Sequence, residues 1–134
     1  MDNLRNPMLP PAIIVHGMRD IRSALAPALP VTILSAPGAA LYAGCGWWAA
    51  LLTAGGVSCP AFLDCADAPG RAWEGLKLGL PGIILAPCPA WPQIAAYAAT
   101  RKAALLDSAP PALDLAAPGA ARQVAPWLTG IFSL

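Results

Sequence analysis

The sequence predicts an α/β protein built on a parallel sheet. Short apolar runs of strand length alternate with segments of helical periodicity. Residues 23–63 carry no charged side chain, which predicts a densely packed core, and prolines and glycines divide this stretch into pieces too short to span a membrane. The alternation favours a sheet covered by helices on both faces. At 134 residues the chain has the usual size of one domain.

Five apolar runs are the expected strands. The first is rich in β-branched residues and ends before His16, and the others are bounded by proline, glycine or polar turns. The runs are residues 12–15, 31–34, 61–63, 82–86 and 103–106. We expect a five-stranded, mainly parallel sheet in the flavodoxin-like order 2-1-3-4-5, as the central layer of a three-layer sandwich.

Four helices are expected between these strands. They cover residues 20–29, 39–54, 68–78 and 92–102. Pro27 should shorten the first helix, and the second should form despite Gly44 and Gly46. Asp67 is the expected N-cap of the third helix, with Pro69 in its first turn.

The two ends of the chain differ from this central domain. Residues 1–11 form an irregular leader that lacks the apolar run of a signal peptide. Residues 12–115 are the expected α/β domain. Residues 116–134 form a tail whose apolar side chains, Trp127 and Phe132 among them, predict that it docks on the domain or on a partner subunit.

The composition bears on partners. Charged residues make up only 11% of the chain and hydrophobic residues 57%, with five tryptophans. So little charge favours a subunit interface, and we expect a homo-oligomer, with a dimer favoured. The net charge is +1 and the basic residues form no cluster, which argues against nucleic acid.

The four cysteines indicate the compartment. Their spacing matches neither a metal site nor the disulfide framework of a small secreted domain. We therefore expect reduced thiols in a cytoplasmic protein and no metal site. No motif identifies a cofactor.

The candidate ligand site follows from the predicted sheet. In an open parallel sheet, ligands bind at the carboxyl ends of the strands. The polar or nucleophilic residues that follow the expected strands are His16, Ser35, Asp64, Asp67 and Cys88. We expect them to line a pocket for a small molecule in a non-enzymatic binding or regulatory module.

Two other functions stay open. Asp64 and Asp67, three residues apart, predict a small hydrolase or lyase in which an aspartate acts as base or binds a divalent cation and His16 carries the proton. Structural roles also explain both aspartates, as a helix cap and as an acceptor for loop amides. Ser35 lacks the nucleophile-elbow motif of serine hydrolases. The low charge and the apolar tail alternatively predict an oligomerising scaffold.

Three segments carry a family resemblance. They are residues 31–40, residues 63–70, which read Leu-Asp-Cys-Ala-Asp-Ala-Pro-Gly, and residues 111–115. They resemble a short, alanine-rich bacterial family of unknown function, over about residues 12–115. The resemblance implies a small stand-alone α/β protein and transfers no functional residue.

Overall fold

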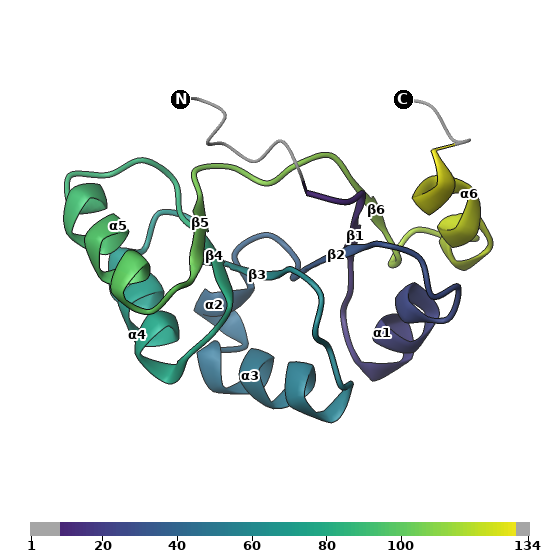
Figure 1. Ribbon diagram of the computed structural model, residues 1–134, viewed down its shortest axis with the longest axis horizontal. Helices are drawn as coiled ribbons and strands as arrows, with labels where there is room; N and C mark the ends of the chain where they lie inside the picture. The colour runs from purple at the N-terminus through teal and green to yellow at the C-terminus, as the bar shows by residue number, and fades with distance from the viewer. Residues whose placement is uncertain (1–8, 131–134) are drawn as a thin grey trace.

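The computed structural model describes residues 9–130 and shows an α/β protein with a parallel sheet (Figure 1). The six strands are β1 (Ala12–Ile14), β2 (Thr32–Leu34), β3 (Ala61–Asp64), β4 (Gly82–Ile84), β5 (Ala104–Leu106) and β6 (Ala112–Asp114). All neighbours run parallel, in the order β5-β4-β3-β2-β1-β6. The parallel α/β class is confirmed, whereas the five-strand count and the order 2-1-3-4-5 are wrong.

The strand order explains why the helices share one face. From β1 to β5, each strand lies beside the one before it. Right-handed crossovers that keep stepping in one direction place every connecting helix on the same side of a sheet. Figure 1 shows the helices gathered on one side. The expected three-layer sandwich is therefore wrong, because the chain does not reverse direction until β5 is complete.

The helices are shorter than the sequence pattern suggests. They are α1 (Met18–Leu25), α2 (Ala39–Tyr42), α3 (Cys45–Ala54), α4 (Pro69–Leu78), α5 (Trp91–Thr100), the 3₁₀ helix η2 (Ala120–Gln123) and α6 (Val124–Thr129). α1 ends two residues before Pro27, as expected. The single helix expected over residues 39–54 is wrong, because Gly44 has a φ of +91° and separates α2 from α3.

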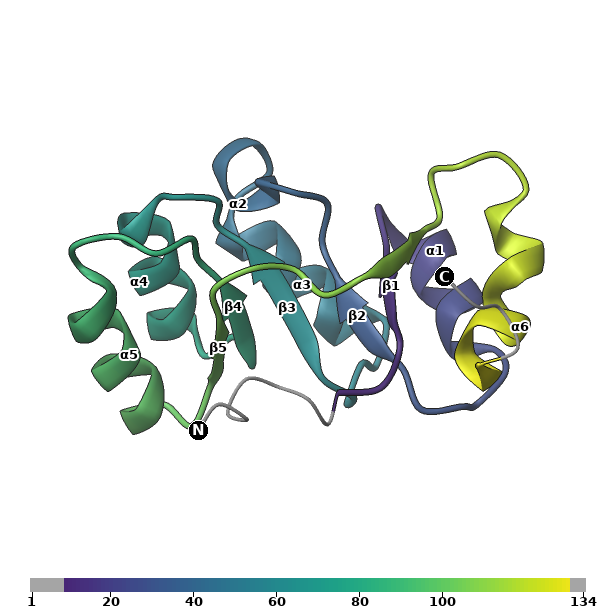
Figure 2. The same cartoon turned by 90° about the horizontal axis from the view of Figure 1, so that it is seen from above.

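The chain returns across the sheet after β5. Residues 107–111 cross the face without helices and lead to β6 at the opposite edge (Figure 2). A return in the opposite direction on the opposite face keeps the crossover right-handed. The sequence pattern missed β6 because its three residues include no β-branched side chain, and its partner β1 lies about 100 residues earlier.

The strands bury side chains on both faces of the sheet. Ile13, Ile33, Leu63 and Ile83 join the helices in the main core. The helix-free face holds a smaller cluster, formed by Ala12, Leu34, Phe62 and Ile84. A Cβ on Gly82 would lie 2.6 Å from both the Phe62 ring and the Ala61 carbonyl oxygen, so only glycine admits this ring.

The C-terminal segment is anchored on β1. Val124, Trp127 and Leu128 are buried in the main core, and the Trp127 indole nitrogen donates a hydrogen bond to the Ala12 carbonyl at 2.8 Å. The expectations for the leader and the tail also concern residues 1–8 and 131–134, which lie outside the described residues. Across residues 9–130, no helix has the length and hydrophobicity to cross a membrane.

Candidate functional site

The five predicted site residues lie at the carboxyl edge of the sheet. His16 follows β1, Ser35 follows β2, Asp64 ends β3, Asp67 precedes α4, and Cys88 lies between β4 and α5. This common edge follows from the parallel pairing of all the strands. Their side-chain contacts divide them into separate groups.

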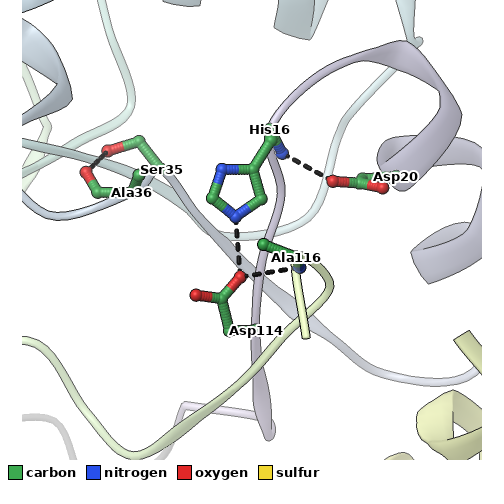
Figure 3. Close-up of polar contacts among 6 residues, drawn as sticks. All are labelled: His16, Asp20, Ser35, Ala36, Asp114 and Ala116. Carbon is green, nitrogen blue, oxygen red and sulfur yellow. Dashed lines mark hydrogen bonds and ion pairs between the residues drawn. The ribbon is translucent and has the colours of Figure 1, made fainter. Parts of the chain in front are cut away.

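His16 pairs with Asp114, a residue that the sequence did not place in the site. Its Nε2 lies 2.6 Å from Asp114 Oδ1 (Figure 3). The two side chains are 36% and 44% exposed, so the pair is open to solvent. The backbone N–H of His16 also donates to Asp20 Oδ2 at 2.9 Å. The register of β6 beside β1 creates the pair, since Asp114 stands opposite Ile14.

Asp114 is stabilised in its charged form. Partial burial raises the pKa of its carboxyl, but the hydrogen bonds from His16 and from the Ala116 amide, together with the attraction of His16, lower that pKa overall. Asp114 is therefore an acceptor that holds the His16 ring in place.

Asp64 and Ser35 connect two loops. Asp64 Oδ1 accepts the backbone N–H of Gly38 at 3.1 Å and of Ala66 at 2.8 Å. Ser35 Oγ accepts the Asp64 N–H at 2.9 Å and donates to the Ala36 carbonyl at 3.0 Å. These contacts are those of an acceptor for loop amides. They also occupy the hydroxyl of Ser35, a residue that is only 3% exposed.

Asp67 and Cys88 are less constrained by hydrogen bonds than the other site residues. The N-cap of α4 is Ala68, and no side chain caps that helix, so the expected capping role of Asp67 is wrong. Pro69 does begin α4, because the first turn needs no amide donor there. Asp67 is exposed and Cys88 is half-buried. Neither side chain makes a hydrogen bond to another described residue.

His16 and Asp64 lie on the same face of the sheet with β2 between them. Ile14 pairs with Leu34, and Leu34 pairs with Phe62. Two residues further along the chain from each of these, the same register aligns His16, Ala36 and Asp64. Side-chain alternation places His16 and Asp64 on the helix-free face. Two strand spacings separate their backbones by about 10 Å. Their side chains make no hydrogen bond to each other in the described part of the chain, and they are near enough to contact one ligand.

Burial makes three of the four thiols, those of Cys45, Cys59 and Cys65, poor nucleophiles. Burial, and then the negative charges of Cys45, Asp64 and Glu74, raise the pKa of Cys65 to about 12. Burial also raises the pKa of Cys45 and of Cys59. Within residues 9–130, no group of three or more His, Cys, Asp or Glu side chains is arranged to hold a metal ion.

The opposite edge of the sheet has a different character. A depression of about 210 Å³ lies there between the ends of α3 and α4, and its lining includes Leu52, Val57, Leu78 and Pro81. None of its lining residues is titratable. This depression therefore offers a ligand no charged side chain, whereas the carboxyl edge offers His16, Asp64 and Asp67.

A repeated motif could have identified Asp114. Residues 63–66 and 113–116 both read Leu-Asp-x-Ala and both end a strand. In each, the aspartate Oδ1 accepts the amide of the alanine two residues later. This signal predicts the turn, but it does not predict that His16 is the second partner of Asp114. No family model, curated protein or solved structure matches this chain.

Proposed function

We propose that the protein is a non-enzymatic module that binds a small molecule at the carboxyl edge of its sheet, over His16, Ser35, Asp64, Asp67 and Cys88. The observation that carries the proposal is the alignment of His16 and Asp64 on one face, about 10 Å apart across Ala36. A methyl group between two polar side chains leaves room for a ligand to contact both.

Two carboxylate oxygens without hydrogen-bond partners among residues 9–130 support this proposal. Asp64 and Asp114 each use Oδ1 for two hydrogen bonds, and neither Oδ2 has a hydrogen-bond partner among residues 9–130. These two oxygens accept hydrogen bonds, so they suit a ligand with amino or hydroxyl groups. The cytoplasm belongs to the same proposal, because all four cysteines are free, as in a reducing compartment.

The environments of Ser35 and Cys65 favour binding over covalent catalysis at these two residues. The Ser35 hydroxyl is buried and makes two hydrogen bonds, and the Cys65 thiol has a pKa of about 12. No hydrogen bond joins His16 to Ser35, Asp64 or Asp67 in the described part of the chain. A covalent mechanism would therefore need these groups to move.

An NMR screen tests the proposal. Amine-, diol- and carboxylate-bearing fragments are added to ¹⁵N-labelled protein, and saturable shifts are expected at the amides of His16, Ala36 and Ala66. Asp64→Asn should weaken the best fragment about tenfold, through the lost charge-assisted hydrogen bond. Asp107→Asn, at the same edge but outside the proposed site, should leave affinity unchanged. Saturable shifts confined to Val57 and Leu80 at the far depression, or none at all, would refute the proposal.

The His16–Asp114 pair favours one second candidate. A carboxylate that orients an imidazole is the arrangement of a general base. A hydrolase or lyase would use His16 to activate water or substrate beside Asp64 or Asp67. Turnover of nitrophenyl esters or phosphate monoesters that His16→Gln abolishes and Asp114→Asn reduces would establish this activity. Equal rates in all three proteins would exclude it for those substrates.

A further inference from the structure

The C-terminal segment, residues 112–130, joins the rest of the fold at one edge of the sheet. It contains β6, η2 and α6, and Figure 1 shows β6 and α6 beside β1 and α1. β6 is an edge strand that pairs only with β1. The other five strands keep all their pairings without it. The segment can therefore separate from the sheet without breaking any other pair of strands.

β1 and the loop after it receive the polar contacts of the segment. Within residues 9–130, the hydrogen bonds from the segment to the rest of the chain end on residues 12–16. They are the β1–β6 ladder, the bond from the Trp127 indole to the Ala12 carbonyl at 2.8 Å, and the contact between His16 and Asp114 at 2.6 Å. One strand and its loop thus hold the segment by hydrogen bonds, whereas β2, β3 and β4 each pair on both sides.

The strap that leads to the segment, residues 107–111, adds little to its attachment. It crosses the helix-free face of the sheet (Figure 2). Within residues 9–130, no backbone hydrogen bond joins the strap to the sheet, and Pro110 and Pro111 have no amide to donate. Four of its five residues are exposed. The segment can therefore move without unfolding the elements that precede the strap.

The segment would lose apolar contacts on opening. Four of its side chains are buried, those of Ala120, Val124, Trp127 and Leu128. Against this loss stands the conformational entropy that every residue of the segment regains when it is freed. Parts of a fold that bury few side chains and attach at one edge open at a lower free energy than the central strands do. The segment therefore has the features of a separately opening unit.

We infer that residues 112–130 open as one unit while the other five strands stay paired, and that docking of this unit completes the ligand site. Asp114 lies in the segment, whereas His16 and Asp64 lie in the part that stays paired. Opening takes from the carboxyl edge both the acceptor that holds His16 and one of the two carboxylate oxygens that have no partner within residues 9–130. The opening is independent of any ligand, and only its effect on the site rests on the proposed function.

Native-state hydrogen exchange tests the opening. Exchange in the full chain is followed by NMR at several urea concentrations below the unfolding transition. The segment amides are Leu115, which donates to the Ile14 carbonyl, and Leu128 in α6. The central amides are Ile33 and Cys65, which donate to acceptors at β3 and β4. The two segment amides should share one protection factor and one urea dependence, with protection at least about tenfold lower than that of the central amides.

Two variants remove buried methyl groups, one on each side of the proposed boundary. Ile83→Val changes β4, three strands away from β1. It destabilises the native and the open state alike, so it should speed exchange of the central amides about fivefold and leave the segment amides unchanged. Val124→Ala changes the segment itself. It destabilises only the docked state, so it should speed exchange of both sets.

Three results would overturn this inference. Equal acceleration of both sets by Ile83→Val would mean that the segment opens only when the whole molecule unfolds. Different urea dependences at Leu115 and Leu128 would mean that parts of the segment fray separately.

The third result concerns the ligand site. A saturating concentration of the tightest fragment from the screen described above should slow exchange of the segment amides about tenfold, because the open state lacks Asp114. A fragment that binds and leaves this exchange unchanged would show that docking does not complete the site. A screen without any binder would refute the proposed function, and the exchange rates of the two variants would still decide whether the segment opens.

Discussion

Two buried tryptophans differ in one hydrogen bond. The indole nitrogen of Trp127 donates to the Ala12 carbonyl at 2.8 Å. The indole nitrogen of Trp48 is fully buried and has no partner among the described residues. A buried donor without an acceptor costs about 1–3 kcal/mol. The two residues therefore test what a made and an unmade hydrogen bond contribute to the same core.

Phenylalanine at each position gives a matched pair of variants. Both changes remove the same atoms, but Trp127→Phe deprives the Ala12 carbonyl of a donor, whereas Trp48→Phe removes an unsatisfied one. We expect Trp127→Phe to lower the free energy of unfolding by about 1–2 kcal/mol more than Trp48→Phe does. Urea unfolding measures both. Equal losses would mean that Trp48 has an acceptor in solution.

The charge on Asp114 should stabilise the fold more at neutral pH than at acidic pH. Its pKa is lower in the folded than in the unfolded protein, so its charge stabilises the fold above about pH 4, the unfolded value. This contribution disappears as the pH falls through the folded pKa. Asp114→Asn should lower the free energy of unfolding at pH 6 by less than about 1 kcal/mol, because the pair is exposed.

The free energy of unfolding of both proteins, measured at several pH values from 6 to 3, tests this prediction. The free-energy gap between wild type and Asp114→Asn should shrink as the pH falls. Asp107→Asn controls for loss of one surface carboxylate, because among residues 9–130 the Asp107 side chain accepts a hydrogen bond only from the adjacent Ser108. A gap that is constant across this range would show that the charge of Asp114 adds no stability.

The sequence predicted where the site residues lie better than what they contact. Parallel strands made their common edge predictable for His16, Ser35 and Asp64. The contact between His16 and Asp114 depends on β6 pairing with β1, so it could not be predicted without the sheet order. Asp67 looked like a helix cap, but α4 begins with its proline and uses no side-chain cap.

At the level of elements, α5 stabilises the end of α4. Arg101, just after α5, donates from Nε to the Leu76 carbonyl at 2.9 Å and from its guanidinium to the Lys77 carbonyl at 3.2 Å. These carbonyls belong to the last turn of α4, where no later N–H group of the helix can donate to them. A cation there also interacts favourably with the helix dipole. One side chain thus joins two elements.

Replacing Arg101 should weaken this junction. Arg101→Met keeps the aliphatic stem and removes both donors, so we expect a loss of about 1 kcal/mol in the free energy of unfolding. Lys102→Met removes the same charge next to it without a hydrogen bond to α4. It should cost less than half as much. Denaturant unfolding compares the two, and equal effects would assign the loss to charge alone.

A proline directly precedes four of the six strands. Pro11, Pro60, Pro81 and Pro111 each directly precede a strand. The Pro11, Pro60 and Pro81 carbonyls accept amides from neighbouring strands. Proline suits a strand start because its missing donor interrupts no ladder. Pro111 would have indicated β6, although only three residues follow before the strand ends.

In the whole molecule, short-range sequence patterns and long-range strand pairing determine different features of the fold. Apolar runs, helical spacing and turn residues act over a few positions, and by themselves they determined the α/β class, the parallel sheet and the first five strands. Strand order, the single helix layer and the His16–Asp114 pair depend on which strands meet. Those choices depend on burying both faces of the sheet at once, so only the tertiary structure decided them.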